Sequence, residues 1–215
     1  MTRLRTAIVA VLALALTALS PGAASAAPAP TPEELMSDID TAVSVTDAFW
    51  AQTMDGYTSP RVVGLYDGSQ PGAPTCNGEP LEPENARYCG PPEDFVAWDV
   101  TLMGQAFELG DAFVYMVVAH EWGHAIQARL AEEQRTVDFE LQADCLAGGT
   151  LYGAAAAGML QFEEGDEKEI ANGLIYVADE FAWGDPSHHG DAFQRIDAFN
   201  KGRTGGVTAC IPGLS

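Results

Sequence analysis

Positive charge is scarce in this chain of 215 residues, which has 10 lysines and arginines against 31 aspartates and glutamates. The formal net charge of −21 repels the phosphates of nucleic acids and of anionic lipids, so we expect neither as a partner. Collagen-like and heptad patterns are absent, and a hydrophobic content of 47% excludes an intrinsically disordered protein. The length instead fits one domain with a sizeable buried core.

A long apolar run is also missing. The run over residues 7–19 is shorter than the roughly 20 apolar residues that a membrane-spanning helix needs. Arg3 and Arg5 precede this run, and residues 24–26 form an A-x-A cleavage site. The pattern predicts a secretory signal peptide over residues 1–26, with a retained anchor as the alternative. We therefore expect an extracytoplasmic protein that is not stably inserted in a membrane after cleavage.

Cysteines at C-x-x-C spacing do not occur, which argues against a thioredoxin-like site and against a zinc ribbon. The chain has four cysteines, Cys76, Cys89, Cys145 and Cys210. An even number in an exported protein predicts two disulfides, with three possible connectivities. Cys76–Cys89 is the local choice, and it leaves Cys145 to pair with Cys210.

Hydrophobic periodicity predicts a single α+β domain over residues 32–215, mostly helical and with a small sheet, after a mobile lead-in at 27–31. We expect helices over about 32–54, 111–130, 137–160, 168–183 and 191–201, and strands over 61–66 and 95–102. Residues 69–94 are rich in proline, glycine, asparagine and glutamate, which predicts an irregular loop. Internal repeats and a domain boundary are not evident.

The most informative segment is His120-Glu121-Trp122-Gly123-His124, inside the strongest helical stretch. Two histidines at i and i+4 lie on one face of a helix, where both can bind one Zn²⁺. Glu121 lies beside them, close enough to polarise a metal-bound water. The alternative is a pair of partly exposed histidines that bind no metal. The apolar run over residues 113–119 argues against it, because it buries the helix, and two buried histidines without a partner would cost free energy.

A catalytic zinc site needs a third protein ligand and an open position. A third histidine at the metzincin spacing is absent, because Gln134 and Arg135 stand there. The next predicted helix carries Glu140 and Asp144 at i and i+4. We expect Glu140 to reach the metal and Asp144 to accept the N–H of a ligating imidazole. The alternative for both is a solvated helix face in an acidic protein.

These segments resemble a known family. HEWGHAIQ followed by ELQADCLAG is similar to the neutral zinc metallopeptidase family of the gluzincin group, whose pattern is close to HEFGHHVQ followed by ELQADCxAG. The resemblance covers about residues 35–212 and includes all four cysteines. Further matching positions are Tyr88-Cys89, His189-Gly190, Gln194-Arg195 and Ala209-Cys210.

The resemblance implies a zincin-like fold in which His120, His124 and Glu140 bind zinc and Glu121 is the catalytic base. It also supports the pairing of Cys145 with Cys210. The chain departs from the family at Ala125, where histidine is frequent, and at Gly149-Thr150, where the family has a bulky pair. Gly149 thins its helix, so substrate preference could differ.

Two further side chains have open roles. His189 follows a predicted turn with His188, and we expect it to donate a hydrogen bond to the oxyanion formed when a peptide carbonyl is attacked. The alternative is a structural or capping histidine pair. Arg195 could pair with a carboxylate of the site such as Asp144.

The sequence thus predicts a secreted zinc metallopeptidase in which Glu121 assists the attack of a zinc-bound water on a peptide bond. Its expected partner is a peptide or protein substrate. Two alternatives remain. One is a non-catalytic, chaperone-like zinc-binding module, and the other is a zinc amidase that acts on cell-wall peptides.

Overall fold

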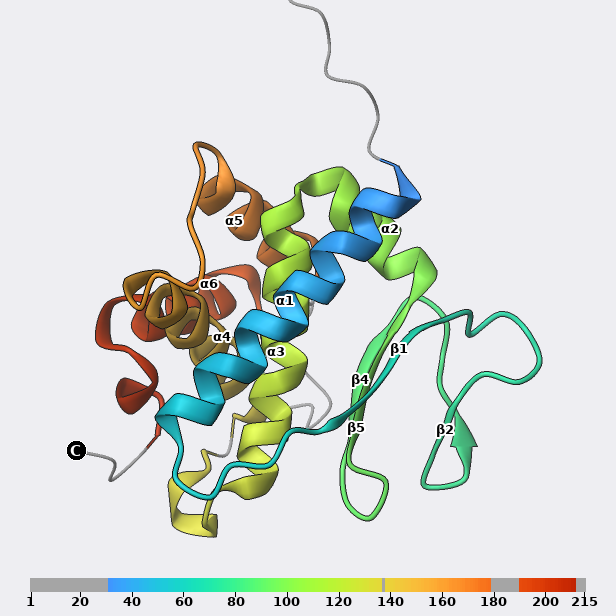
Figure 1. The fold of residues 1–215 in the computed structure, drawn as a ribbon, viewed down its shortest axis with the longest axis horizontal. Coiled ribbons are helices and arrows are strands. Elements are labelled where there is room, and N and C mark those ends of the chain that lie inside the picture. The colour runs from blue at the N-terminus through green and yellow to red at the C-terminus, as the bar shows by residue number, and fades with distance from the viewer. Residues whose placement is uncertain (1–30, 137, 179–189, 212–215) are drawn as a thin grey trace, which may run out of the picture.

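The structure, a computed structural model, describes residues 31–136, 138–178 and 190–211. In this part of the chain, helices pack beside a small sheet, which confirms the predicted α+β class (Figure 1). The predicted signal peptide and most of the lead-in lie outside the described residues. The helices are α1 (Pro32–Thr53), α2 (Val100–Leu109), α3 (Asp111–Arg129), α4 (Phe139–Ala156), α5 (Asp166–Tyr176) and α6 (Ala192–Gly205), with short 3-10 turns η1 (Glu132–Gln134) and η2 (Val207–Ala209).

Within the described residues, no helix combines the length and the apolar character that crossing a membrane requires.

The described sheet is mixed and has the strand order β1-β5-β4. Strand β1 (Arg61–Tyr66) runs parallel to β5 (Phe95–Asp99), and β4 (Ala86–Cys89) runs antiparallel to β5. A separate small hairpin joins β2 (Thr75–Cys76) to β3 (Glu79–Pro80). The prediction of an irregular loop was wrong for β4, because pairing with β5 and the Cys76–Cys89 disulfide hold this segment extended.

The predicted second strand is also shorter than expected, since β5 ends at Asp99 and α2 follows at once. The buried carboxylate of Asp99 accepts hydrogen bonds from the backbone N–H groups of Thr101 and Gly68, each at 2.8 Å. It thereby caps the first turn of α2 and ties it to the turn after β1. The sequence analysis took the residues after Asp99 as strand and missed α2.

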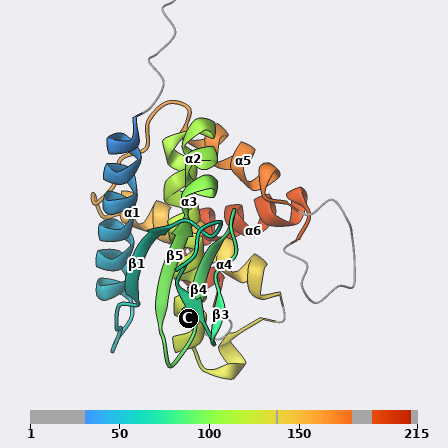
Figure 2. The same cartoon turned by 90° about the vertical axis from the view of Figure 1, so that its right-hand side faces the viewer.

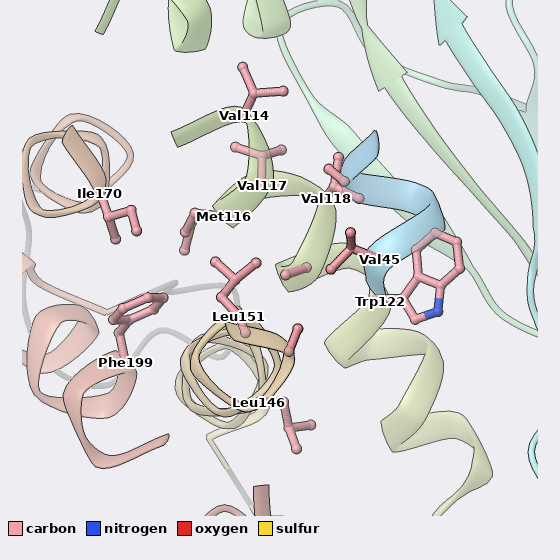
Figure 3. Packing of buried hydrophobic residues seen from close by; sticks show 14 of the residues in the cluster. Val45, Val114, Met116, Val117, Val118, Trp122, Leu146, Leu151, Ile170 and Phe199 are labelled. Atoms are coloured by element: carbon pink, nitrogen blue, oxygen red, sulfur yellow. The ribbon is translucent and has the colours of Figure 1, made fainter. Parts of the chain in front are cut away.

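Helix α3 lies at the centre of the fold and contacts α1, α2, α4, α5 and strands β4 and β5. Figure 2 shows α1 on one side of it and α5 and α6 on another. Apolar side chains of α3 meet Leu146 and Leu151 of α4, Ile170 of α5 and Phe199 of α6 in one core (Figure 3). Burial around almost the whole circumference holds α3 in a fixed position, which suits a helix that carries a functional site.

Helices α4 and α6 approach each other closely. A Cβ atom at Gly202 would lie 1.8 Å from the carbonyl oxygen of Cys145, and one at Gly148 would lie 2.2 Å from that of Phe199. Gly149 packs against Val207 of η2, where a Cβ would lie 2.8 Å from the backbone nitrogen. The thin part of α4 therefore accommodates the segment around Val207, and Gly149 is not among the described residues that line the cleft around the site.

Both predicted disulfides are present. Cys76–Cys89 joins β2 to β4, and Cys145–Cys210 joins α4 to the residue after η2. The four cysteines are thus all paired. Both crosslinks fasten segments that border the site described below.

The ends of α3 and α5 compare differently with the prediction. Helix α3 begins at Asp111, as expected, and Gly110 with φ 138° is its N-cap. Helix α5 begins at Asp166 and ends at Tyr176, well before the predicted residue 183. The carbonyl of the next residue, Val177, accepts a hydrogen bond from Arg195 Nη1 at 2.9 Å, which fastens this end of α5 to α6.

Candidate metal centre

Three side chains from two helices converge on one point. His120 and His124 lie one turn apart on α3, and Glu140 comes from the first turn of α4. The two histidine Nε2 atoms are 3.1 Å apart. Glu140 Oε2 lies 3.2 Å from His120 Nε2 and 3.5 Å from His124 Nε2. The predicted ligand set is therefore brought together, and its donor atoms are close enough to share one ion.

The spacing of these atoms suits a small divalent cation. Ligand atoms at about 2.0–2.1 Å from a tetrahedral Zn²⁺ lie roughly 3.3–3.4 Å from one another. The distances of 3.1, 3.2 and 3.5 Å are near this value. Two imidazoles and one carboxylate leave a fourth position open, which is the arrangement of catalytic rather than structural zinc sites. The donor set therefore fits a metal ion with an exchangeable position.

The outer nitrogens of both rings are held by acceptor side chains. His120 Nδ1 lies 2.8 Å from Asp144 Oδ1, and His124 Nδ1 lies 2.8 Å from Gln127 Oε1. Each ring thus turns its Nε2 atom toward Glu140. The expected role of Asp144 as the partner of a ligating imidazole matches this geometry, whereas the contact of Gln127 was not foreseen.

Arg195 pairs with Asp144, as the sequence analysis considered. Its Nε and Nη2 atoms donate to the two carboxylate oxygens at 2.8 and 2.9 Å. Both side chains are buried. Burial alone raises the pKa of Asp144, but the charges of Arg195 and His120 outweigh it and hold that pKa below its ordinary value. Asp144 therefore stays ionised beside His120.

Burial, charge and hydrogen bonds shift the pKa values of His120 and Glu140. Burial lowers the pKa of His120, but the carboxylates of Asp144 and Glu140 outweigh this effect and raise it to about 10. Burial raises the pKa of Glu140, yet hydrogen bonds from His120 and His124 bring it far below its ordinary value. A cation that binds His120 must therefore compete with a proton on this ring.

Close packing of α3 on α4 explains why the ligands meet. Gly123 lies between the two histidines in sequence, and a Cβ atom there would lie 3.0 Å from both the Cα and the carbonyl oxygen of Ala143. A bulkier residue would push the helices apart. Glycine thus lets α4 bring Glu140 and Asp144 against the two histidines.

The three ligands open into a cleft of about 860 Å³. Glu121, which is 6% exposed, lines it beside His120 and His124. One wall is β4, an edge strand that pairs only with β5 within the described sheet, and Tyr176 of α5 lies at another side. The sequence analysis predicted the helix that carries Tyr176 but not its place beside the ligands, and it missed β4, although Tyr88 and Cys89 in a short alternating stretch were a weak strand signal.

His188 and His189 lie outside the described residues, so the predicted oxyanion role of His189 stays a prediction. The catalytic role assigned to Glu121 likewise remains a prediction from its place beside the ligands.

Comparison of the chain with protein-family models, with curated proteins and with solved structures found no match. The likeness to the neutral zinc metallopeptidases therefore rests on the motifs alone.

Proposed function

We propose that this protein is a secreted zinc metallopeptidase. The observation that carries the proposal is the convergence of His120, His124 and Glu140 in a cleft that also contains Glu121. A site of this kind needs a carboxylate close to the ligands but not bound to the metal, and Glu121 meets that description. A module that only bound zinc would have no need of this additional carboxylate.

The chain's own residues supply the proton transfers. When bound, Zn²⁺ would lower the pKa of a water molecule and polarise the carbonyl of the scissile bond. Glu121 accepts a proton from the attacking water and donates it to the leaving nitrogen, so that C–N cleavage gives a carboxylic acid and an amine. Asp144, held by Arg195, keeps His120 oriented throughout.

The cleft wall favours an extended peptide as the substrate. Strand β4 leaves one edge without a strand partner in the described sheet, and such an edge can pair with an added extended chain. Residues of β4 line the same cleft as the ligands. The net charge of −21 disfavours nucleic acid as an alternative substrate.

Substitution of Glu121 tests the proposal. Glu121→Gln should bind Zn²⁺ as the wild type does but cleave peptides about 10²–10⁴-fold more slowly, because an amide cannot accept the proton. The control is Glu133→Gln, an exposed position in the connection after α3, which should leave both properties unchanged. Metal content and the rate of peptide cleavage are measured on the same preparations.

An unchanged cleavage rate in Glu121→Gln would remove this residue from the mechanism. If neither wild type nor variant cleaves any peptide although both hold zinc, the non-catalytic zinc-binding module replaces the peptidase. Cleavage confined to cell-wall peptides would instead favour the amidase.

A further inference from the structure

We propose that Gln127 is a positioning residue that connects two of the three metal ligands, and that Gln142 fixes the orientation of its amide. Both glutamines are buried, each with 3% of its surface exposed. The inference concerns the metal site alone and does not require that the protein cleaves peptides.

Gln127 contacts the surroundings of two ligands at once. Its Oε1 atom lies 2.8 Å from Nδ1 of His124, one helical turn earlier. Its Nε2 atom donates to the carbonyl oxygen of Phe139 at 2.7 Å, and Phe139 directly precedes Glu140. One side chain therefore holds the ring of His124 and the backbone that carries Glu140.

The orientation of the Gln127 amide follows from the chemistry of its partners. A backbone carbonyl can only accept a hydrogen bond, so the NH₂ group of Gln127 must face Phe139. Its oxygen must then face His124, and Nδ1 of His124 must carry the proton. In neutral His124 the lone pair consequently lies on Nε2, the atom that faces Glu140.

Gln142 further fixes the orientation of the Gln127 amide. Its NH₂ group donates to the carbonyl oxygens of Gln134 and Cys210, both at 3.0 Å. Its Oε1 atom therefore acts as an acceptor and receives Gln127 Nε2 and the backbone N–H of Thr136, both at 3.2 Å. The carbonyl groups of Gln134 and of the disulfide-bonded Cys210 thus fix the orientation of the Gln142 amide. Gln142 in turn fixes the direction of the hydrogen bond between Gln127 and His124.

An amide suits this position better than a carboxylate. At His120 the charge of Asp144 is compensated by Arg195, whereas among the described residues no lysine or arginine forms an ion pair or hydrogen bond with Gln127. A carboxylate at 127 could still accept from His124, yet it could not donate to Phe139 or to Gln142. The two functions of Gln127, to orient His124 and to hold the start of α4, can therefore be separated by substitution.

The test compares Gln127→Met, Gln127→Glu and Gln142→Met with the wild type. The control is Gln52→Met on the exposed face of α1. Zn²⁺ affinity is measured by competition with a chromogenic chelator. The visible absorption of the Co²⁺-loaded protein reports coordination geometry, which a loss of stability alone would not alter. Thermal unfolding of the metal-free proteins identifies variants that fail to fold.

We expect Gln127→Met to bind Zn²⁺ about 10–100-fold more weakly, with an altered Co²⁺ spectrum. Gln127→Glu should keep the wild-type spectrum, because His124 retains its acceptor, but should bind less tightly than the wild type. Gln142→Met should show a smaller loss of affinity, and Gln52→Met none.

Wild-type affinity and spectrum in a folded Gln127→Met would overturn the proposal. If Gln127→Met does not fold, Gln127→Glu decides the question. Unchanged Zn²⁺ affinity in that variant would show that the hydrogen bond from Gln127 to the Phe139 carbonyl does not position Glu140. None of these outcomes depends on peptidase activity, so the proposed function can fail while the positioning role stands.

Discussion

At the scale of single residues, Glu140 is the ligand that sequence reasoning reached with the least support. Helical spacing places His120 and His124 on one face of α3 without reference to any other element. Apart from the family resemblance, Glu140 could be chosen only by assuming that the next helix packs back against α3, and α4 does pack there. Gln127 escaped notice because an amide carries no chemistry of its own, although its i+3 spacing from His124 was visible.

Removal of the Glu140 carboxylate tests the ligand set. Glu140→Ala should weaken Zn²⁺ binding severely and abolish activity, because two histidines alone make an incomplete site. Asp138→Ala is a matched control, since this exposed acid lies two residues away and its side chain does not cap α4. Chelator competition at neutral pH measures both variants. Equal affinities in Glu140→Ala and wild type would refute the assignment.

Metal binding should also depend on pH. With the pKa of His120 at about 10 in the metal-free protein, a metal must displace a proton at any lower pH. The apparent Zn²⁺ affinity should therefore rise by about tenfold per pH unit between pH 7 and 9.

The stability of the metal-free fold should change with pH in the opposite direction to the Zn²⁺ affinity. Because folding raises the pKa of His120 from 6.5, the protonated residue stabilises the metal-free fold fully below pH 6.5, and this contribution disappears as the pH rises through about 10. Chelator competition at several pH values, together with thermal unfolding of the metal-free protein, checks both trends. A Zn²⁺ affinity that is constant from pH 7 to 9 would show that no proton is displaced.

At the scale of elements, hydrophobic periodicity identified the helices and strands that local sequence determines. It missed those that depend on contacts with other parts of the chain. Helix α1 begins where the Thr31 cap, Pro32 and Glu34 predict, with the side chain of Glu34 bonded back to the N–H of Thr31. Helix α2 was missed because its start depends on Asp99, which also binds the distant Gly68. Strand β4 was missed because a four-residue strand depends on its partner β5.

Two glycines with opposite surroundings test the packing of α6 on α4. Gly202→Ala places a Cβ atom against the Cys145 carbonyl and should destabilise the fold by about 1–3 kcal/mol. It should also weaken metal binding, because α6 carries Arg195. Gly104→Ala in α2 meets no atom within 4 Å and should instead stabilise the fold by about 0.5–1 kcal/mol. Thermal or urea unfolding measures the change in the free energy of unfolding for each variant. If both substitutions stabilised the fold, or both destabilised it, this view of the interface would be contradicted.

At the scale of the whole molecule, the fold class, both disulfides and the meeting of the three ligands followed from the sequence. The shape of the cleft did not, because its walls come from β4, α5 and the α3–α4 connection, whose relative placement no local pattern encodes. The acidic surface belongs to this scale too. A net charge of −21 affects encounter with charged substrates but says little about the fold or the chemistry of the cleft.

The most direct test of the central claim is a peptide-library cleavage profile of the purified protein, joined to a metal analysis of the same preparation. The account predicts about one Zn²⁺ per chain, cleavage that stops on chelation, and recovery when Zn²⁺ is restored. Cleavage that persists in a preparation stripped of metal, or a chain that holds no Zn²⁺ when the ion is supplied at neutral pH, would contradict it.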